Sequence, residues 1–295
     1  MRIGIIPNTS KENIVQVVSS FSSLLRKYGF EHQLSDSFLE IKEKLPPEIL
    51  EINFLPLDEL FKQSDLVVSI GGDGTMLTTA HVAINYSTPI MGLNIGKLGF
   101  LAEYDLEGIE SLLQDLRNND YLIEERIVLE ADCLRCVDKK MFSINDVVID
   151  KGGWPKMVEI TIRVDENYVT TFSADGLILA TPTGSTGYSL STGGPVIDPK
   201  SDVIALSPIS PHTLNMRPIV LASSQKIYIN VKSQHSAVYI NCDGQRVHST
   251  PPPLDIVIYK SDKKVRLLRT KSINYFKILR EKLSWGLDIR RNPIL

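Results

Sequence analysis

An apolar stretch that ends in a glycine-rich turn is the feature that most constrains the fold of this chain. Residues 66–70 read Leu-Val-Val-Ser-Ile, and the turn Gly71-Gly72-Asp73-Gly74-Thr75 follows at once. This pattern predicts a buried strand, and we expect a helix to begin near Met76 and to run to about Tyr86. A strand that passes through such a turn into a helix brings backbone N–H groups close to phosphates. We therefore expect phosphoryl-transfer chemistry beside Asp73.

Each residue type in this turn suits phosphate chemistry. The glycines Gly71, Gly72 and Gly74 permit positive φ angles and leave room for a phosphate to approach the backbone. Asp73 can accept or orient the proton of an attacking hydroxyl, or help to hold a divalent cation, and Thr75 can cap the helix or bind phosphate. The alternative is an ordinary strand-to-helix turn. The turn lacks the Gly-Lys-Ser/Thr of a Walker A loop and the spacing of a Rossmann fingerprint.

Alternating strand and helix signals surround the turn. Residues 1–6 predict a first strand, apolar residues recur at helical spacing over 14–25, and Gly29 is a plausible helix end. Residues 31–50 are polar and charged, and we expect a surface excursion there. Residues 89–94 predict another short strand, which ends in a second glycine turn at 96–100. This order predicts a doubly wound, Rossmann-like parallel sheet with ligands at the carboxyl ends of its strands.

The pattern changes near residue 125. Short β-type runs separated by turn residues continue to residue 260, which predicts a β-rich second domain. Residues 265–268 form a separate short apolar run, and 273–283 resemble a final helix that returns to the first domain. We therefore expect an α/β domain of residues 1–125 with a tail of 271–295, and a β-rich domain of residues 126–270. The expected β runs are 128–134, 145–149, 158–164, 177–181, 226–231, 238–242 and 254–259.

Length and composition agree with two globular domains. The chain has 295 residues and a formal net charge of −3 without a large charge block, so we expect no nucleic-acid partner. No apolar run is long enough for a membrane span. The three cysteines predict no disulfide framework, and Cys133 and Cys136 lack the second pair that a zinc site needs. We expect a reduced, cytoplasmic protein.

Polar residues also follow the strands of the second half. Asn145-Asp146 at a strand start can hydrogen-bond an adenine or ribose edge, although such pairs are also common strand caps. Asp175-Gly176 leads into residues 181–195, which are rich in Gly, Ser and Thr. By composition this stretch could be a flexible linker, but it follows directly on a strand. Tyr188 within it can stack on a base or pack in a half-buried position.

Taken together in their order, these motifs resemble the NAD kinase family, from about residue 2 to residue 285. The Thr-Pro-Thr-Gly-Ser-Thr string at 181–186 is the most specific of them, whereas the first glycine turn is shared with lipid kinases and phosphofructokinases. The matching segments are 71–75, 94–101, 145–146, 175–176, 181–195, 210–218, 243–245 and 285–286.

The resemblance implies transfer of the γ-phosphoryl group of ATP to the 2′-hydroxyl of the adenosine ribose of NAD, which gives NADP. It implies Asp73 as the proton acceptor, a divalent metal ion such as Mg²⁺ that no side chains are assigned to hold, and a homo-oligomer, either a dimer or a tetramer. The implied phosphate-contacting residues are Gly71, Gly72, Gly74 and Thr75. The implied NAD-binding residues are Asp73, Gly74, Phe100, Asn145, Asp146, Lys156, Ser173, Asp175, Thr186, Gly187, Tyr188, Ser189, Leu190, Ser191 and Gln245.

Two positions depart from the family pattern, since the family often has Ala at the position of Gly187 and Glu at that of Asp146. Two other functions stay open. A diacylglycerol-type lipid kinase shares the first motif but needs an apolar slot, which the polar residues of 181–195 disfavour. A non-catalytic sensor that binds NAD is disfavoured by the retained Asp73.

Overall fold

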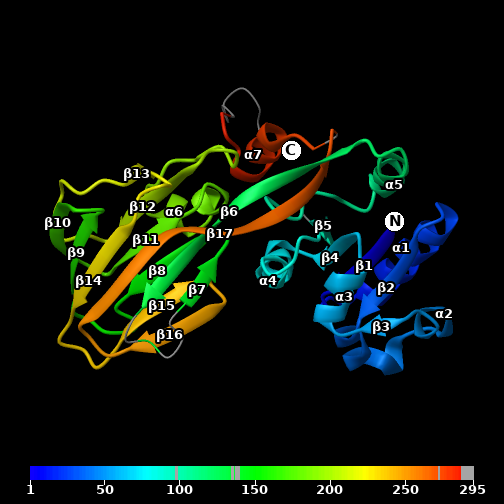
Figure 1. Cartoon of the computed structure of the whole chain (residues 1–295), viewed down its shortest axis with the longest axis horizontal. Helices are drawn as coiled ribbons and strands as arrows, with labels where there is room; N and C mark the ends of the chain where they lie inside the picture. The colour runs from blue at the N-terminus through cyan, green and yellow to red at the C-terminus, as the bar shows by residue number, and fades with distance from the viewer. Residues whose placement is uncertain (97–98, 134–135, 137–139, 272, 287–295) are drawn as a thin grey trace. The chain divides into compact units, whose positions relative to one another are not determined.

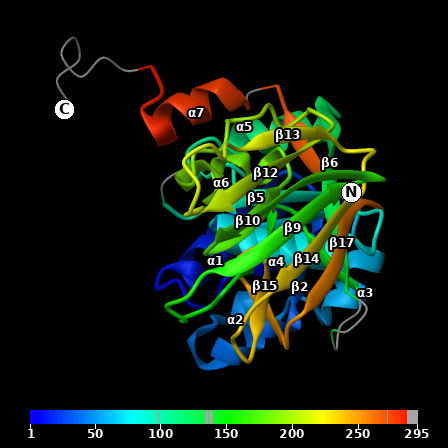
Figure 2. The same cartoon turned by 90° about the vertical axis from the view of Figure 1, so that its left-hand side faces the viewer.

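A computed structural model describes residues 1–96, 99–133, 136, 140–271 and 273–286 of the chain (Figures 1 and 2). The chain divides into two compact units. One is Met1–Glu125 with Val265–Leu295, and the other is Arg126–Lys264. The β-rich unit ends at residue 264, whereas the domain expected from the sequence ended at residue 270. Two long strands, β6 (Tyr121–Cys133) and β17 (Leu254–Thr270), contribute residues to both units.

The first unit is the α/β unit. Its parallel strands lie in the order β5-β4-β1-β2-β3, and the end of β17 pairs with β5 in parallel through Leu267 and Ile90. The strands are β1 (Arg2–Pro7), β2 (Glu31–Ser35), β3 (Phe54–Leu55), β4 (Leu66–Gly71) and β5 (Ile90–Asn94). The helices are α1 (Ile14–Lys27), η1 (Asp36–Lys44), α2 (Pro47–Leu50), α3 (Leu57–Gln63), α4 (Asp73–Ala83), α5 (Ile109–Arg117) and α7 (Tyr275–Leu283).

One expectation for the α/β unit is wrong. Residues 31–50 are not a surface excursion, because β2 lies between β1 and β3 and its Leu34 is fully buried. The polar sequence Glu-His-Gln-Leu-Ser concealed this strand, since Gln33 is also buried and donates a hydrogen bond to Ser64 Oγ at 3.1 Å. Sequence pattern alone could not show that a buried glutamine has a partner 31 residues away.

The strand order of the α/β unit creates a topological switch point. From β1 the chain adds β2 and β3 on one side, and β4 and β5 lie on the other side. Parallel sheets of this kind bind ligands outside the carboxyl ends of the strands where the order reverses. Here those ends are Pro7 in β1 and Gly71 in β4, so the glycine turn begins at the switch point.

The second unit is β-rich, as expected. One sheet has six antiparallel strands in the order β13-β12-β11-β8-β15-β16. Beside β17, a second set follows the order β10-β9-β14-β17, and β6 pairs with β17 and β7 (Figure 2). The strands are β7 (Lys140–Ser143), β8 (Asp146–Asp150), β9 (Val158–Val164), β10 (Asn167–Ala174), β11 (Gly176–Ala180), β12 (Val203–Ile209), β13 (Ile219–Ala222), β14 (Ile227–Lys232), β15 (Val238–Cys242) and β16 (Arg246–Thr250).

The core of the β-rich unit lies between its two sets of strands. Strand β9 buries every second residue, as a strand with one covered face does. Strand β11 is buried along its whole length, because Ile178 and Ala180 pack in a second cluster with Ile197 on its other face. The apolar runs at 254–259 and 265–268 belong to one strand, β17, since the polar residues between them continue the extended backbone.

The cysteines differ from expectation. The sequence predicted no disulfide, whereas Cys133 and Cys136 form one. The expectation rested on the number of cysteines alone, which says nothing of how close two of them lie in the fold. Strand β6 ends at Cys133, and the N–H of Cys136 donates to the carbonyl oxygen of Cys133 at 3.3 Å, so the two cysteines lie close together. Cys242 is buried as a free thiol.

Candidate active site

Asp73 is the carboxylate of the first glycine turn, and three backbone N–H groups hold it. It is the first residue of α4, three residues earlier than the predicted helix start near Met76. Its Oδ2 accepts a hydrogen bond from the N–H of Phe100 at 2.9 Å, and its Oδ1 accepts from the N–H groups of Leu101 at 3.0 Å and Ala102 at 2.9 Å. A carboxylate has about four acceptor positions, so one on Oδ2 is not used by the described residues and can accept from a further donor.

The second glycine turn is shaped around this carboxylate. A side chain at Gly99 would overlap the carboxyl group of Asp73, so a residue with a Cβ would displace it. The two glycine turns that the sequence singled out therefore meet at Asp73. Residues 97–98 of the second turn lie outside the described residues.

Thr75 is tied to the end of β1. Its Oγ1 accepts hydrogen bonds from Asn8 Nδ2 at 2.8 Å and from the N–H of Gly72 at 3.5 Å. Gly71 is buried against this side chain, whereas Gly72 is partly exposed and Gly74 is exposed. The Thr75 hydroxyl thus bridges the two sides of the switch point, a contact with Asn8 that the sequence did not predict.

In the β-rich unit, Asp243 organises the segment that carries Asn145 and Asp146. Its Oδ1 accepts from the N–H groups of Ile144, Asn145 and Asp146 at 3.0, 2.7 and 3.2 Å. Its Oδ2 accepts from Arg246 Nη2 at 2.6 Å. Asp243 lies in the turn between β15 and β16, with a φ of 57°. The family resemblance included the segment 243–245, but it implied a role only for Gln245.

The segment 181–195 packs directly on Asn145 and Asp146. Thr181 Oγ1 donates to the carbonyl oxygen of Ile144 at 2.6 Å and accepts from the N–H of Gly184 at 3.1 Å. Gly184 itself abuts the backbone of Asn145, where a Cβ would overlap the carbonyl oxygen. This stretch forms the short helices η2 (Thr183–Thr186) and α6 (Tyr188–Ser191), so the linker alternative is wrong.

The two polar side chains at the start of β8 differ in their surroundings. Asn145 Oδ1 is buried and has no hydrogen-bond partner among the described residues. Asp146 is 5 % exposed, and burial first and the negative charge of Asp243 second raise its pKa to about 7. A buried acceptor of this kind is normally satisfied, so the position suits a ligand that donates hydrogen bonds.

The raised pKa of Asp146 predicts a pH-dependent stability. The folded state favours the protonated carboxyl group of Asp146. The contribution of this group to the free energy of unfolding is therefore highest near pH 4 and falls as the pH rises through about 7, where the carboxyl group loses its proton. Asp146→Asn removes the charge, and we expect this variant to be more stable than the wild-type protein by about 2–4 kcal/mol at pH 8, with little difference at pH 4. Urea unfolding of both proteins at the two pH values measures this. An equal difference at both pH values would contradict it.

The predicted ligand-binding residues in the segment 186–191 differ in how far they are exposed. Tyr188 is 48 % exposed, and Gly187 and Ser191 are exposed, so these three are accessible to a ligand. Ser189 is fully buried, and its Oγ lies 3.1 Å from Ser207 Oγ, which is a packing contact inside the unit. Thr186 and Leu190 are half-buried.

The five remaining predicted residues lie elsewhere in the structure. Lys151 Nζ forms an ion pair with Asp175 Oδ1 at 2.6 Å. Lys156 and Ser173 line one cavity of about 500 Å³ in the β-rich unit, and Lys156 Nζ donates to Gln234 Oε1 at 3.1 Å. Gln245 is exposed in the turn that begins with Asp243. Phe100, in the α/β unit, contributes the N–H that holds Asp73 Oδ2, and its ring is 6.4 Å from that of Tyr275.

Two kinds of feature are absent from the part of the chain that the structure describes. There, no three or more His, Cys, Asp and Glu side chains lie together in a way that would hold a metal ion. No helix of residues 1–96, 99–133, 140–271 and 273–286 is long and apolar enough to cross a membrane.

An α/β unit with a carboxylate held at its switch point, joined to a β-rich unit with a polar ligand position, defines a phosphotransferase of two domains. Family models support this class. Residues 3–121 match the ATP-NAD kinase N-terminal domain, and residues 144–270 match the ATP-NAD kinase C-terminal domain.

Individual relatives match three quarters or more of the chain. The NAD kinase of Prosthecochloris aestuarii is 37 % identical over 287 residues, which are 97 % of this chain and 98 % of the relative. The NAD kinase of Clostridium botulinum is 45 % identical over 223 residues, 75 % and 79 % of the two chains. The chain therefore belongs to the NAD kinase family, as its motifs predicted.

Solved structures confirm the fold. A crystal structure of an NAD kinase from Archaeoglobus fulgidus in complex with ATP superposes with a TM-score of 0.73 at 25 % identity, over 96 % of this chain and 98 % of that one. A crystal structure of yeast NADH kinase complexed with NADH gives a TM-score of 0.86 at 22 % identity, over 98 % and 88 %.

Proposed function

We propose that this protein transfers the γ-phosphoryl group of ATP to the 2′-hydroxyl of the adenosine ribose of NAD, which gives NADP. The observation that carries the proposal is the placement of Asp73, a carboxylate with one open acceptor position beside a glycine turn at the switch point of a parallel sheet. Phosphoryl transfer depends mainly on positioning and on charge neutralisation, which such a site supplies.

In this proposal, Asp73 receives the ribose hydroxyl on Oδ2. The three N–H donors fix the direction of the carboxylate, so the accepted proton and the attacking oxygen have a defined orientation. The backbone of Gly71, Gly72 and Gly74, with the hydroxyl of Thr75, contacts the phosphates at the start of α4, where the helix dipole favours negative charge.

Asn145 and Asp146 bind the dinucleotide in this proposal. The buried Oδ1 of Asn145 and the carboxyl group of Asp146 can accept hydrogen bonds from an amino group or a ribose hydroxyl. The exposed Tyr188 can pack on a ring of the ligand. We assign Lys156, Ser173, Asp175 and Gln245, with the remaining predicted residues of 186–191, to the same substrate.

A divalent metal ion fits this site only in company with the nucleotide. Mg²⁺ commonly keeps several waters and binds substrate phosphates with one or two carboxylates, so it does not need a cluster of side chains. When bound, it supplies charge neutralisation on the phosphates. We also propose that the protein acts in the cytoplasm as a homo-oligomer. Exposed apolar residues of the edge strand β13, Ile219 and Val220, each 44 % exposed, support self-association.

One assay separates this function from the two alternatives. We expect the purified protein to form NADP when it is incubated with ATP, Mg²⁺ and NAD, and to form no phospholipid in a parallel reaction with diacylglycerol. A phospholipid product would favour a lipid kinase. Binding of NAD without formation of NADP would favour a non-catalytic sensor. Chromatography of the nucleotides and extraction of the lipids measure the two products.

A further inference from the structure

The backbone that holds Asp73 is one short segment, residues 99–104. Its residues 100–102 donate the three N–H groups to the carboxylate. The segment is fastened to β5 at its other end, since the N–H of Tyr104 donates to the carbonyl oxygen of Gly92 at 3.2 Å and the N–H of Asn94 donates to that of Tyr104 at 2.7 Å. The three donors of Asp73 are therefore held in place through β5.

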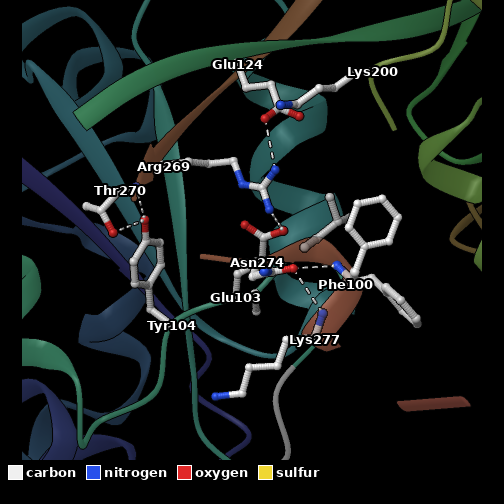
Figure 3. A network of polar contacts seen from close by, with 12 residues as sticks. Phe100, Glu103, Tyr104, Glu124, Lys200, Arg269, Thr270, Asn274 and Lys277 are labelled. Atoms are coloured by element: carbon white, nitrogen blue, oxygen red, sulfur yellow. Dashed lines mark hydrogen bonds and ion pairs between the residues drawn. The ribbon is translucent and has the colours of Figure 1, made fainter. Parts of the chain in front are cut away.

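The residue that follows these donors is bound to the end of β17. Glu103 Oε1 accepts from Arg269 Nη2 at 2.7 Å, and the other end of the guanidinium, Nη1, donates to Glu124 Oε2 at 2.9 Å. Figure 3 shows Arg269 between the two carboxylates. The side chains of Arg269 and Glu103 are 8 % and 4 % exposed, so solvent screens their attraction little.

A hydrogen bond also joins the next residue of each segment, Thr270 and Tyr104. The N–H of Thr270 donates to Tyr104 Oη at 2.8 Å, also visible in Figure 3. Two consecutive residues of β17 thus bind two consecutive residues of the segment that holds Asp73. All of these groups belong to the α/β unit. Arg269 and Thr270, which are distant in sequence, therefore bind the segment whose N–H groups donate to Asp73.

We propose that Glu103 and Arg269 are positioning residues for Asp73. A buried ion pair adds little net stability compared with apolar side chains, but it fixes geometry, because each charge requires the other at a defined distance. Here the fixed element is the peptide chain beside the carboxylate of Asp73. The inference rests on the proposed function, since it concerns the orientation of Asp73 during phosphoryl transfer.

The test measures kcat and the KM for NAD in variants of the pair. We expect Glu103→Gln and Arg269→Met each to lower kcat by about tenfold or more while the KM for NAD changes by less than about twofold, because small displacements of a catalytic group slow chemistry while substrate binding in the β-rich unit is kept. Arg269→Lys should recover part of the loss, since its ammonium group can still pair with one carboxylate. Thermal unfolding of each variant checks that it is folded.

Glu130→Gln is the matched control. Glu130 is also buried, at 8 % exposure, and accepts from Lys140 Nζ at 2.8 Å, Tyr259 Oη at 2.9 Å and Ser261 Oγ at 2.9 Å. It belongs to the β-rich unit, and none of these three partners is in the segment 99–104 that holds Asp73. We expect lower stability and wild-type kcat for this control. Wild-type kcat in Glu103→Gln, or an equal loss of kcat in Glu130→Gln, would overturn the inference alone. Absence of NADP with the wild-type protein would overturn the proposed function with it.

Discussion

Asp73→Asn is expected to lower kcat by about 10²–10⁴-fold, the range typical of losing a group that accepts a proton in the transition state. The amide keeps one acceptor oxygen, so it cannot satisfy both the N–H of Phe100 and the N–H groups of Leu101 and Ala102. It also removes the negative charge that the ribose hydroxyl needs as its partner. Steady-state kinetics with ATP and NAD measure kcat.

Binding of NAD should survive this substitution. The predicted dinucleotide contacts of Asn145 and Asp146 lie in the β-rich unit, so we expect the NAD dissociation constant of Asp73→Asn to stay within about threefold of wild type by calorimetry.

Asp105→Asn is the control for Asp73→Asn. Asp105 is an exposed aspartate of the same unit that accepts one backbone N–H, that of Gly108, at 2.8 Å. It should keep wild-type kcat. Turnover of Asp73→Asn equal to that of this control would refute the role of Asp73.

Asp243→Asn should raise the KM for NAD by about tenfold or more and should destabilise the protein by about 3 kcal/mol. The substitution leaves Arg246 without its charged partner and places an amide group among N–H donors, at a side chain with no exposed surface. The segment with Asn145 and Asp146 then loses its common acceptor. NAD titrations and urea unfolding measure the two effects.

A second aspartate separates this effect from backbone strain. Asp165 also adopts a positive φ, 51° against 57° for Asp243, but it is exposed and accepts the N–H of Lys226 at 2.9 Å. Asparagine tolerates this backbone region as well as aspartate does. Asp165→Asn should therefore change neither the KM for NAD nor the stability by much. Similar losses in both variants would show that the hydrogen bonds of Asp243 are not the cause.

Local signals predicted the reaction class and the fold class. The run 66–70 and the turn that follows it contain the apolar residues, glycines and carboxylate that a strand, a tight turn and a phosphate site each require. Strand β9 could be predicted from its alternation alone. Strand β2 could not, because the residue that makes its buried Gln33 tolerable, Ser64, is distant in sequence.

The sequence by itself determined that a carboxylate stands at a glycine turn and that a strand begins at or next to Asn145 and Asp146, because both facts follow from the order of neighbouring residues. Only the tertiary structure decided how these groups are held. Asp73 is fixed by the segment 99–104, and the segment before β8 by Asp243, through hydrogen bonds between residues 27–29 and 97–99 positions apart. Such pairings depend on which chain ends the folded sheets bring together, and a local pattern of residues does not contain that information.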